Sequence, residues 1–350
     1  MSFASNRVAT TTTINLLPKV VDTILNSNVF AGRMLRSSEK WSGERIRIPI
    51  KYQTNTTGQS FAGFDTFSTA ASNTRANMEY QPKFYQITVA LPLDELSTNM
   101  TDAQIIDLAA VEMKSSAQDM ADGIGTLFYS DGTGNGGKDF LGLGAIVDDG
   151  TSVDSIGGLS RATYPTLDST VTASSGTLSL AKMSTLYNAI SSGSVTPTLG
   201  LVTEVVYALY ESLLQPQERI VKDVPLMKGK VSGGLNAGTG LIGGTGYTGL
   251  YYKGFPVLAD EKTTSGTMFF LNENFINWYA LPVFGTEAVK YKSVDIQGND
   301  YSDVMGLGFS WSGWIKPVNS ASVIGHIYLG GELTTDDPKR HGKLTGITAV

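Results

Sequence analysis

The stretch Ser130–Asp139, "SDGTGNGGKD", looks like a site that could bind a nucleotide. Gly132, Gly137 and Lys138 reproduce most of the phosphate-binding loop, in which a glycine and four further residues precede Gly-Lys. That loop needs Ser or Thr next, to bind Mg²⁺, but Asp139 stands there and its carboxylate would repel phosphate. The loop also needs a strand before it, whereas here a long helical pattern ends. We therefore interpret the segment as the end of a helix followed by a glycine turn.

A second glycine motif, G-x-G-x-x-G at Gly238, Gly240 and Gly243, is typical of dinucleotide-binding folds. No convincing strand precedes it, and no acidic residue follows at the required distance within a βαβ frame. We interpret the surrounding glycine-dense stretch, residues 229–249, as a mobile loop.

Side chains for metal or nucleophilic chemistry are scarce. The chain has no cysteine, which excludes disulfides and thiolate sites, and only two histidines, His326 and His341, neither of which has neighbours suggestive of catalysis. Three acidic pairs are interpreted as solvated loop charges, with a divalent-cation site as the alternative: Asp148-Asp149, Asp260-Glu261 and Asp336-Asp337. The sequence thus predicts no catalytic residue, no cofactor and no metal site.

Composition points to an architectural protein. Of 350 residues, 17% are charged, below the roughly 25% of ordinary soluble domains, and 39 are glycine. Such a composition favours strands, turns and extended loops. The net charge of −6 argues against a protein that grips nucleic acid along its length, although a protein that merely encloses it is compatible. Since no apolar run has the length of a signal-peptide core or membrane span, we expect an intracellular, soluble protein.

Two alternating patterns predict strands that would position any functional surface. In "RIRIPIKY", Arg45–Tyr52, the isoleucines share one face and the basic residues the other, and Pro49 suits an edge strand. "YQITVALPL", Tyr85–Leu93, alternates in the same way, and we expect the two to pair as a long hairpin.

Residues 53–84 between these strands show no steady period and are too many for a loop inside one compact domain. Phe61, Phe64 and Phe67 recur there at spacings of three. Exposed aromatic side chains on such a loop favour docking on another chain, with a local mini-core as the alternative.

The strongest helix prediction is Asp102–Tyr129, whose apolar residues recur at steps of three and four. Thr101 and Gln104 form a capping-box arrangement, and Gly123 and Gly125 either weaken the helix or permit close packing near its end. Residues 1–44 are predicted to be an arm with one helix near residues 16–25. Further elements are a helix at 179–193, a buried strand running into a helix at 199–214, strands at 250–260 and 267–281 with Trp278 in the core, and an antiparallel pair around 318–321.

This order of elements resembles the major capsid proteins of tailed bacteriophages, the family with the Hong Kong 97 fold. "RIRIPIKY" and "YQITVALPLDEL" resemble the edges of that family's extended loop, and Thr101–Leu143 resembles its spine helix with the glycine turn and "GL" segment that follow. "SIGGLSRATYPTL" is similar to a "GGLSR" stretch common after them. The strand pair at 250–272 and the closing segment at 325–347 resemble parts of the axial and peripheral domains.

The resemblance implies an α+β fold with an N-terminal arm (1–44), an extended loop (45–93), a spine helix and first part of the peripheral domain (94–165), an axial domain (166–290) and a return to the peripheral domain (291–350). It implies a structural subunit, not an enzyme, that forms hexamers and pentamers of an icosahedral virion shell, assembled in the host bacterial cytoplasm around double-stranded DNA. Implied partners are further copies, a portal protein and a decoration protein, with no membrane and no sequence-specific DNA contact.

Two departures from some relatives can be argued from residues. Only about 40 residues precede the extended loop, so we expect a separate scaffolding protein rather than a fused scaffold. Residues 54–81 contain no lysine, with Lys51 and Lys83 at the base, so we expect no covalent crosslink through this loop. Denaturing gels of mature particles should show a single band, and a ladder of covalent oligomers would contradict this.

The rival hypotheses are a nucleotide-binding enzyme, from the glycine motifs, and a secreted surface-layer or adhesin protein, from the Thr, Ser and Gly content. The capsid hypothesis depends on residues 1–44 and 53–84 finding their packing partners on sister copies. Its candidate assembly contacts are Phe61, Phe64, Phe67, Arg45, Arg47, Lys51 and Arg75.

Overall fold

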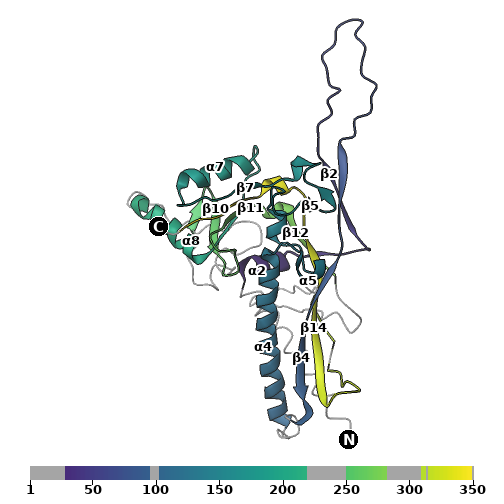
Figure 1. The fold of residues 1–350 in the computed structure, drawn as a ribbon, viewed down its shortest axis with the longest axis vertical. Coiled ribbons are helices and arrows are strands. Elements are labelled where there is room, and N and C mark those ends of the chain that lie inside the picture. The colour runs from purple at the N-terminus through teal and green to yellow at the C-terminus, as the bar shows by residue number, and fades with distance from the viewer. Residues whose placement is uncertain (1–27, 95–101, 219–249, 282–308, 313, 349–350) are drawn as a thin grey trace, which may run out of the picture.

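The computed structural model describes residues 28–94, 102–218, 250–281, 309–312 and 314–348. A body of two sheets and several helices lies at the centre (Figure 1). A narrow ribbon with a long loop projects from one end, and helix α4 runs with strands β4 and β14 toward the other. Within the described residues, none of the helices combines the length and the apolar character that crossing a membrane would need.

One sheet has five strands, with β14 at its centre. The strands are β1 (Glu39–Lys40), β12 (Ile276–Ala280), β14 (Ser322–Thr335), β13 (Phe309–Trp311) and β4 (Lys83–Pro92). β14 pairs antiparallel with β4 from Ser322 opposite Pro92 to Gly331 opposite Lys83. The predicted alternation of β4 is confirmed, because Val89 and Leu91 are buried while the residues between them are exposed.

The long helix α4 (Asp102–Tyr129) has the bounds that its apolar spacing predicts. Ala117, Met120, Ala121, Ile124 and Phe128 are buried along one side. The predicted cap at Thr101 lies outside the described residues. A 28-residue helix is about 42 Å long at 1.5 Å per residue, so α4 provides a straight support for the β4–β14 part of the sheet.

Both glycines of α4 allow a close approach, as the sequence suggested. A methyl group at Gly125 would lie 2.5 Å from the Asn28 side-chain nitrogen, and one at Gly123 would lie 2.3 Å from the Tyr85 hydroxyl. Asn28 is buried and donates to the Ala121 carbonyl at 2.7 Å, whereas the Tyr85 hydroxyl is the far end of a side chain that can turn aside.

These two positions form a matched test of close packing. We expect Gly125→Ala to lower the free energy of unfolding by about 1–3 kcal/mol, because overpacking against Asn28 outweighs the better helix propensity of alanine. We expect Gly123→Ala to be near neutral. Urea unfolding of the two variants checks this, and equal stabilities would contradict it.

The second sheet has six strands in the order β7 (Thr170–Thr172), β15 (Gly342–Leu344), β11 (Met268–Leu271), β8 (Leu199–Val202), β10 (Phe255–Ala259) and β9 (Leu250–Tyr252). β8 and β11 are buried at every residue, which explains their continuous apolar sequences. One face, with Leu201 and Phe269, joins the main core with α4. The other face, with Val202 and Phe270, packs with helices α7 (Leu180–Ile190) and α8 (Glu204–Glu218).

These elements confirm the predicted helix at 179–193, where the Ser179 hydroxyl caps α7 by accepting from the Lys182 N–H, and the strand running into a helix at 199–214. Trp278 is fully buried, as predicted. Strand pairing crosses the predicted domain boundaries, since β12 pairs with β14 and β15 pairs with β11. The boundaries themselves stay a prediction.

The glycine-rich stretch Ser130–Asp139 is a turn. It holds the four-residue helix α5 (Gly134–Gly137), within which Asn135 and Gly136 have positive φ. The remaining short elements are α6 (Leu143–Ile146), β5 (Ser155–Ile156), β6 (Leu159–Ser160) and the 3₁₀ turns η1 (Pro165–Leu167), η2 (Glu273–Phe275) and η3 (Pro338–Arg340).

The predicted hairpin between residues 45–52 and 85–93 is wrong. β2 (Ile46–Lys51) pairs antiparallel with β3 (Arg75–Tyr80), from Ile46 opposite Tyr80 to Lys51 opposite Arg75, and β4 pairs with β14 instead. Met78 and Tyr80 of β3 are buried, so the end of the stretch 53–84 packs on its own subunit.

The described part of the predicted N-terminal arm also packs on its own subunit, which corrects the expectation that residues 1–44 depend on sister copies. Helix α2 (Val29–Arg36) buries Phe30 and Leu35 in the main core. The Phe30 N–H donates to the Asp260 carboxylate at 3.0 Å, and Arg33 bonds Glu273 through two nitrogens. The predicted helix near residues 16–25 lies outside the described residues.

Candidate assembly surfaces

The β2–β3 ribbon is a two-stranded sheet with one free edge. The Tyr52 N–H donates to the Thr74 carbonyl, so the backbone N–H and C=O groups of the even-numbered residues of β2 point toward β3. The backbone nitrogen of Pro49 therefore points away from β3, toward the open edge of the ribbon. The predicted edge role of Pro49 is thereby confirmed. Ile46, Ile48 and Ile50 lie half-buried against the core and anchor the ribbon.

The other face of the ribbon is basic. Arg45 and Arg47 both bond Glu79, at 3.2 and 2.9 Å. Lys51 and Arg75 lie directly opposite each other across the two strands, and no described residue forms an ion pair with either. Four predicted contact residues thus share one surface, but two of them already have a partner within their own subunit.

Beyond the ribbon, residues 53–73 form an almost wholly exposed loop that carries the aromatic tip, Phe61, Phe64 and Phe67. Their exposed fractions are 67%, 106% and 59%. The Phe61 and Phe67 rings meet edge-on at 5.2 Å between centroids, yet this contact buries neither ring. The aromatic tip therefore has no mini-core among the described residues, and its apolar area faces solvent.

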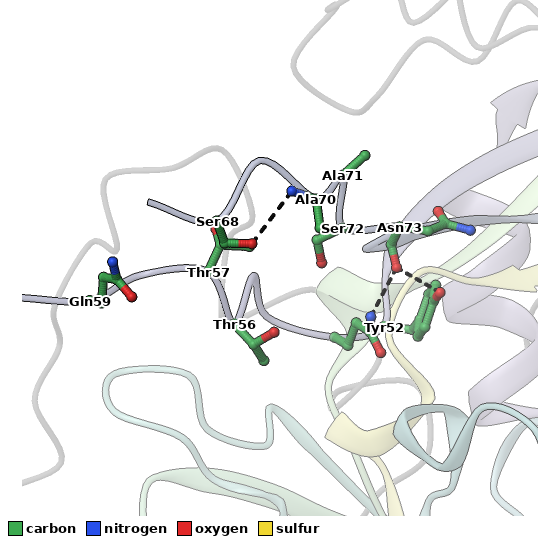
Figure 2. Close-up of a pocket in the computed structure, with 10 residues that line it drawn as sticks. Tyr52, Thr56, Thr57, Gln59, Ser68, Ala70, Ala71, Ser72 and Asn73 are labelled. Carbon is green, nitrogen blue, oxygen red and sulfur yellow. Dashed lines mark hydrogen bonds between the residues drawn. The ribbon is translucent and has the colours of Figure 1, made fainter. Parts of the chain in front are cut away.

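Between the ribbon and the aromatic tip the two legs of the loop enclose a polar opening of about 450 Å³ (Figure 2). Tyr52 and Gln53 close its base through bonds to the Asn73 carbonyl, and Gln59 bonds the Thr66 carbonyl at 3.0 Å. Its lining is uncharged throughout. Such a lining has hydroxyl groups but no side chain that could act as a base to activate them, and no charged ligand for a cofactor.

A buried joint connects the base of the loop to the body. Lys83 donates to the carbonyls of Asp139 and Gly132 in the glycine turn and lies 3.6 Å from the Glu332 carboxylate. Glu332 also accepts from the Leu141 N–H at 2.6 Å. In the sequence Lys83 stands out only as a lysine at the base of the extended loop, and Glu332 does not stand out, because the two partners are far apart in the chain.

In two of the acidic pairs one carboxylate is buried while its neighbour, Asp149 or Glu261, is exposed, which corrects the sequence interpretation for Asp148 and Asp260. Asp148 is buried, accepts three backbone N–H bonds from the turn that follows it, and lies 3.6 Å from Lys343. Asp260 is buried and caps α2. Both carboxylates organise the fold, and among the described residues no group of three or more His, Cys, Asp or Glu is arranged to hold a metal ion.

Two buried titratable groups, His341 and Glu332, contribute to the free energy of unfolding with opposite dependence on pH. His341 is fully buried, and burial lowers its pKa from 6.5 to about 3. Burial raises the pKa of Glu332 from 4.5 to about 7, although Lys83 and the N–H groups of Leu141 and Leu333 act in the other direction. The stability that neutral His341 contributes is complete above pH 6.5 and is lost toward pH 3. The contribution of Glu332 is complete below pH 4.5 and is lost as the pH rises through 7.

We therefore expect the two effects to cancel nearly between pH 6.5 and 4.5. Over that window His341→Gln should become more stable as the pH falls, and Glu332→Gln less stable, each by up to about 1.4 kcal/mol per pH unit. Denaturant unfolding of the unassembled subunit at three pH values tests this, with the double variant as control. Parallel curves for the two single variants would refute the assignment.

The second glycine motif, at Gly238, Gly240 and Gly243, lies outside the described residues. Lys138 and Asp139 of the first stand on a turn after α4 rather than between a strand and a helix. The described residues next to Lys138 and Asp139 do not form a phosphate-binding loop.

Comparison with known proteins shows which solved structures share this fold. No family profile and no curated protein matches the sequence. Among solved structures, the cyanophage A-1(L) capsid is 14% identical, with 92% of this chain and 93% of that chain covered and a TM-score of 0.64. The capsid of Myoviridae phage XM1 is 11% identical, with 90% of each chain covered and a TM-score of 0.52. A holo-encapsulin complex from Synechococcus elongatus is 11% identical, with 91% and 87% covered and a TM-score of 0.53.

These structures match over nine-tenths or more of this chain, so the likeness is one of the whole fold rather than of a single part. Because the sequence identities are low while the architecture is shared, the likeness establishes the fold and not the function. The chain therefore has the α+β Hong Kong 97 fold of tailed-phage capsid proteins, as the resemblance in its sequence implied.

Proposed function

We propose that this chain is the major capsid protein of a tailed bacteriophage, a structural subunit that assembles into hexamers and pentamers of an icosahedral shell around double-stranded DNA. One observation carries the proposal: residues 53–73, with three exposed phenylalanines, project from a subunit of this fold and leave apolar area that no described residue covers and that a second copy would bury.

The remaining surfaces agree with a structural role. The uncharged opening in the loop and the buried, fold-organising carboxylates offer no reaction chemistry among the described residues. The net charge of −6 suits a shell that encloses DNA without gripping it. A portal protein, a separate scaffolding protein and a decoration protein belong to the proposal as partners, and the virion capsid as its location.

Expression of the full chain in a bacterial host followed by sedimentation and negative-stain microscopy tests the assembly. We expect closed particles of uniform diameter. A compact monomer that stays monodisperse at high concentration would overturn the proposal. Because the fold also occurs in an encapsulin complex, the content needs its own test. Particles from the natural source should hold double-stranded DNA that nuclease cannot reach.

A further inference from the structure

The exposed ribbon holds two like charges in an unfavourable position. Lys51 and Arg75 are Cα partners across β2 and β3, and side chains directly opposite on one face lie about 5 Å apart at Cβ. Like charges in such a pair destabilise the strand pairing. Two rungs away, Arg47 faces Glu79 and the charges are compensated. The Lys51–Arg75 pair lacks this compensation, and a carboxylate placed between the two would supply it.

A group of side chains with the opposite charge lies along α4. Glu112, Asp119 and Asp122 follow at steps of seven and three residues, which places them on one side of the helix. Asp119 and Asp122 are exposed. Asp122 already bonds Lys262 at 3.3 Å, whereas no described residue forms an ion pair with Asp119. Across Asp102–Tyr129 the sequence has five acidic residues and one lysine.

Figure 1 shows the β2–β3 ribbon extending from the body in one direction and α4 running in the other, so a contact between the two is one between copies. We propose that the Lys51–Arg75 pair of one copy binds Asp119 on α4 of a second copy. This inference rests on the proposed shell function and names the contact that orients the loop.

The spacing allows a second contact in the same interface. Arg47 lies four residues from Lys51, or about 13 Å along the strand. Glu112 lies seven residues from Asp119, or about 10 Å along the helix. Side chains of ordinary length bridge this difference, so Arg47 meets Glu112 when Lys51 and Arg75 hold Asp119.

Nucleic acid is the other class of partner that a basic surface suggests. It is disfavoured because Glu79 sits within the basic face and bonds both Arg45 and Arg47, which would place a carboxylate against the phosphates. The local excess is two cations at one position of the ribbon, neither of them paired with a described residue, which suits a single carboxylate.

Engineered cysteines give a direct test, because the natural chain contains no cysteine. The variant Lys51→Cys with Asp119→Cys, assembled and then mildly oxidised, should give a ladder of disulfide-linked oligomers on a non-reducing gel. Each single variant should give none, and neither should Lys51→Cys with Glu211→Cys, an exposed acid on α8. Intact particles of the paired variant without a ladder would overturn the contact while the proposed function stands.

Charge reversal adds a functional readout. Lys51→Glu with Arg75→Glu should lower the yield of particles at least tenfold, and adding Asp119→Lys should restore it, whereas adding Glu211→Lys should not. Failure of that rescue, or particles that form normally but lose their DNA, would overturn the contact. If wild-type particles never form, the proposed function and this inference fall together.

Discussion

Replacing Arg161 with alanine is expected to leave no stably folded subunit. The Arg161 side chain is 1% exposed, and its guanidinium donates to the carbonyls of Ala145, Asp148 and Leu167. These carbonyls belong to the segment that joins α4 to the second sheet. Alanine would leave them buried without a donor and would open a cavity. Loss of one partner from such a buried charged network costs about 3–5 kcal/mol, a large part of the 5–15 kcal/mol that stabilises a typical domain.

The measurement is soluble yield together with the thermal unfolding of whatever is recovered. Arg161→Lys should also fail, because one ammonium cannot reach carbonyls that the planar guanidinium bonds from two nitrogens. The matched control is Arg47→Ala on the exposed ribbon, which should change the free energy of unfolding by no more than about 0.5 kcal/mol. A well-folded Arg161→Ala subunit with wild-type stability would refute the role assigned to this residue.

The periodicity of apolar residues predicts where helices and strands lie, but it does not predict which strands pair. The spacing of apolar residues predicts α4 to the residue, and the alternation in residues 83–92 predicts which side of β4 is buried. Nothing local indicates that β4 pairs with β14, more than 200 residues later, because β2 is nearer in sequence and has the same alternating pattern as β4. The strand β3 was missed although its six residues, "RANMEY", alternate polar and apolar types, because this short alternation ends a long stretch without a steady period.

The same limit applies to the functional surfaces. The exposed position of Phe61, Phe64 and Phe67 could be predicted, because three aromatic residues in a long loop without turns or period have few places to pack. The buried network around Arg161 and the joint between Lys83 and Glu332 could not. Arg161 lies in the "GGLSR" stretch that carried part of the family resemblance, but its carbonyl partners become neighbours only after the chain folds.

Removing the aromatic tip is expected to abolish assembly while the subunit stays folded. In the variant Phe61→Ser, Phe64→Ser, Phe67→Ser, each lost ring forfeits about 2 kcal/mol of burial at the contact with a second copy, or about 6 kcal/mol per contact. A shell repeats this contact at every subunit, so the losses accumulate. The folded monomer is unaffected because all three rings are exposed and surface substitutions rarely change stability by more than about 0.5 kcal/mol.

Sedimentation velocity and circular dichroism separate assembly from folding in this test. The variant should sediment as a folded single chain or small oligomer, with a far-ultraviolet spectrum like that of the wild type. Phe84→Ser is the matched control, since Phe84 is also half exposed but stands on β4, outside the loop. It should assemble normally. Particles of wild-type size and yield from the triple variant would show that the loop contributes no essential contact, and the covering of its aromatic side chains by a second copy would have to be abandoned.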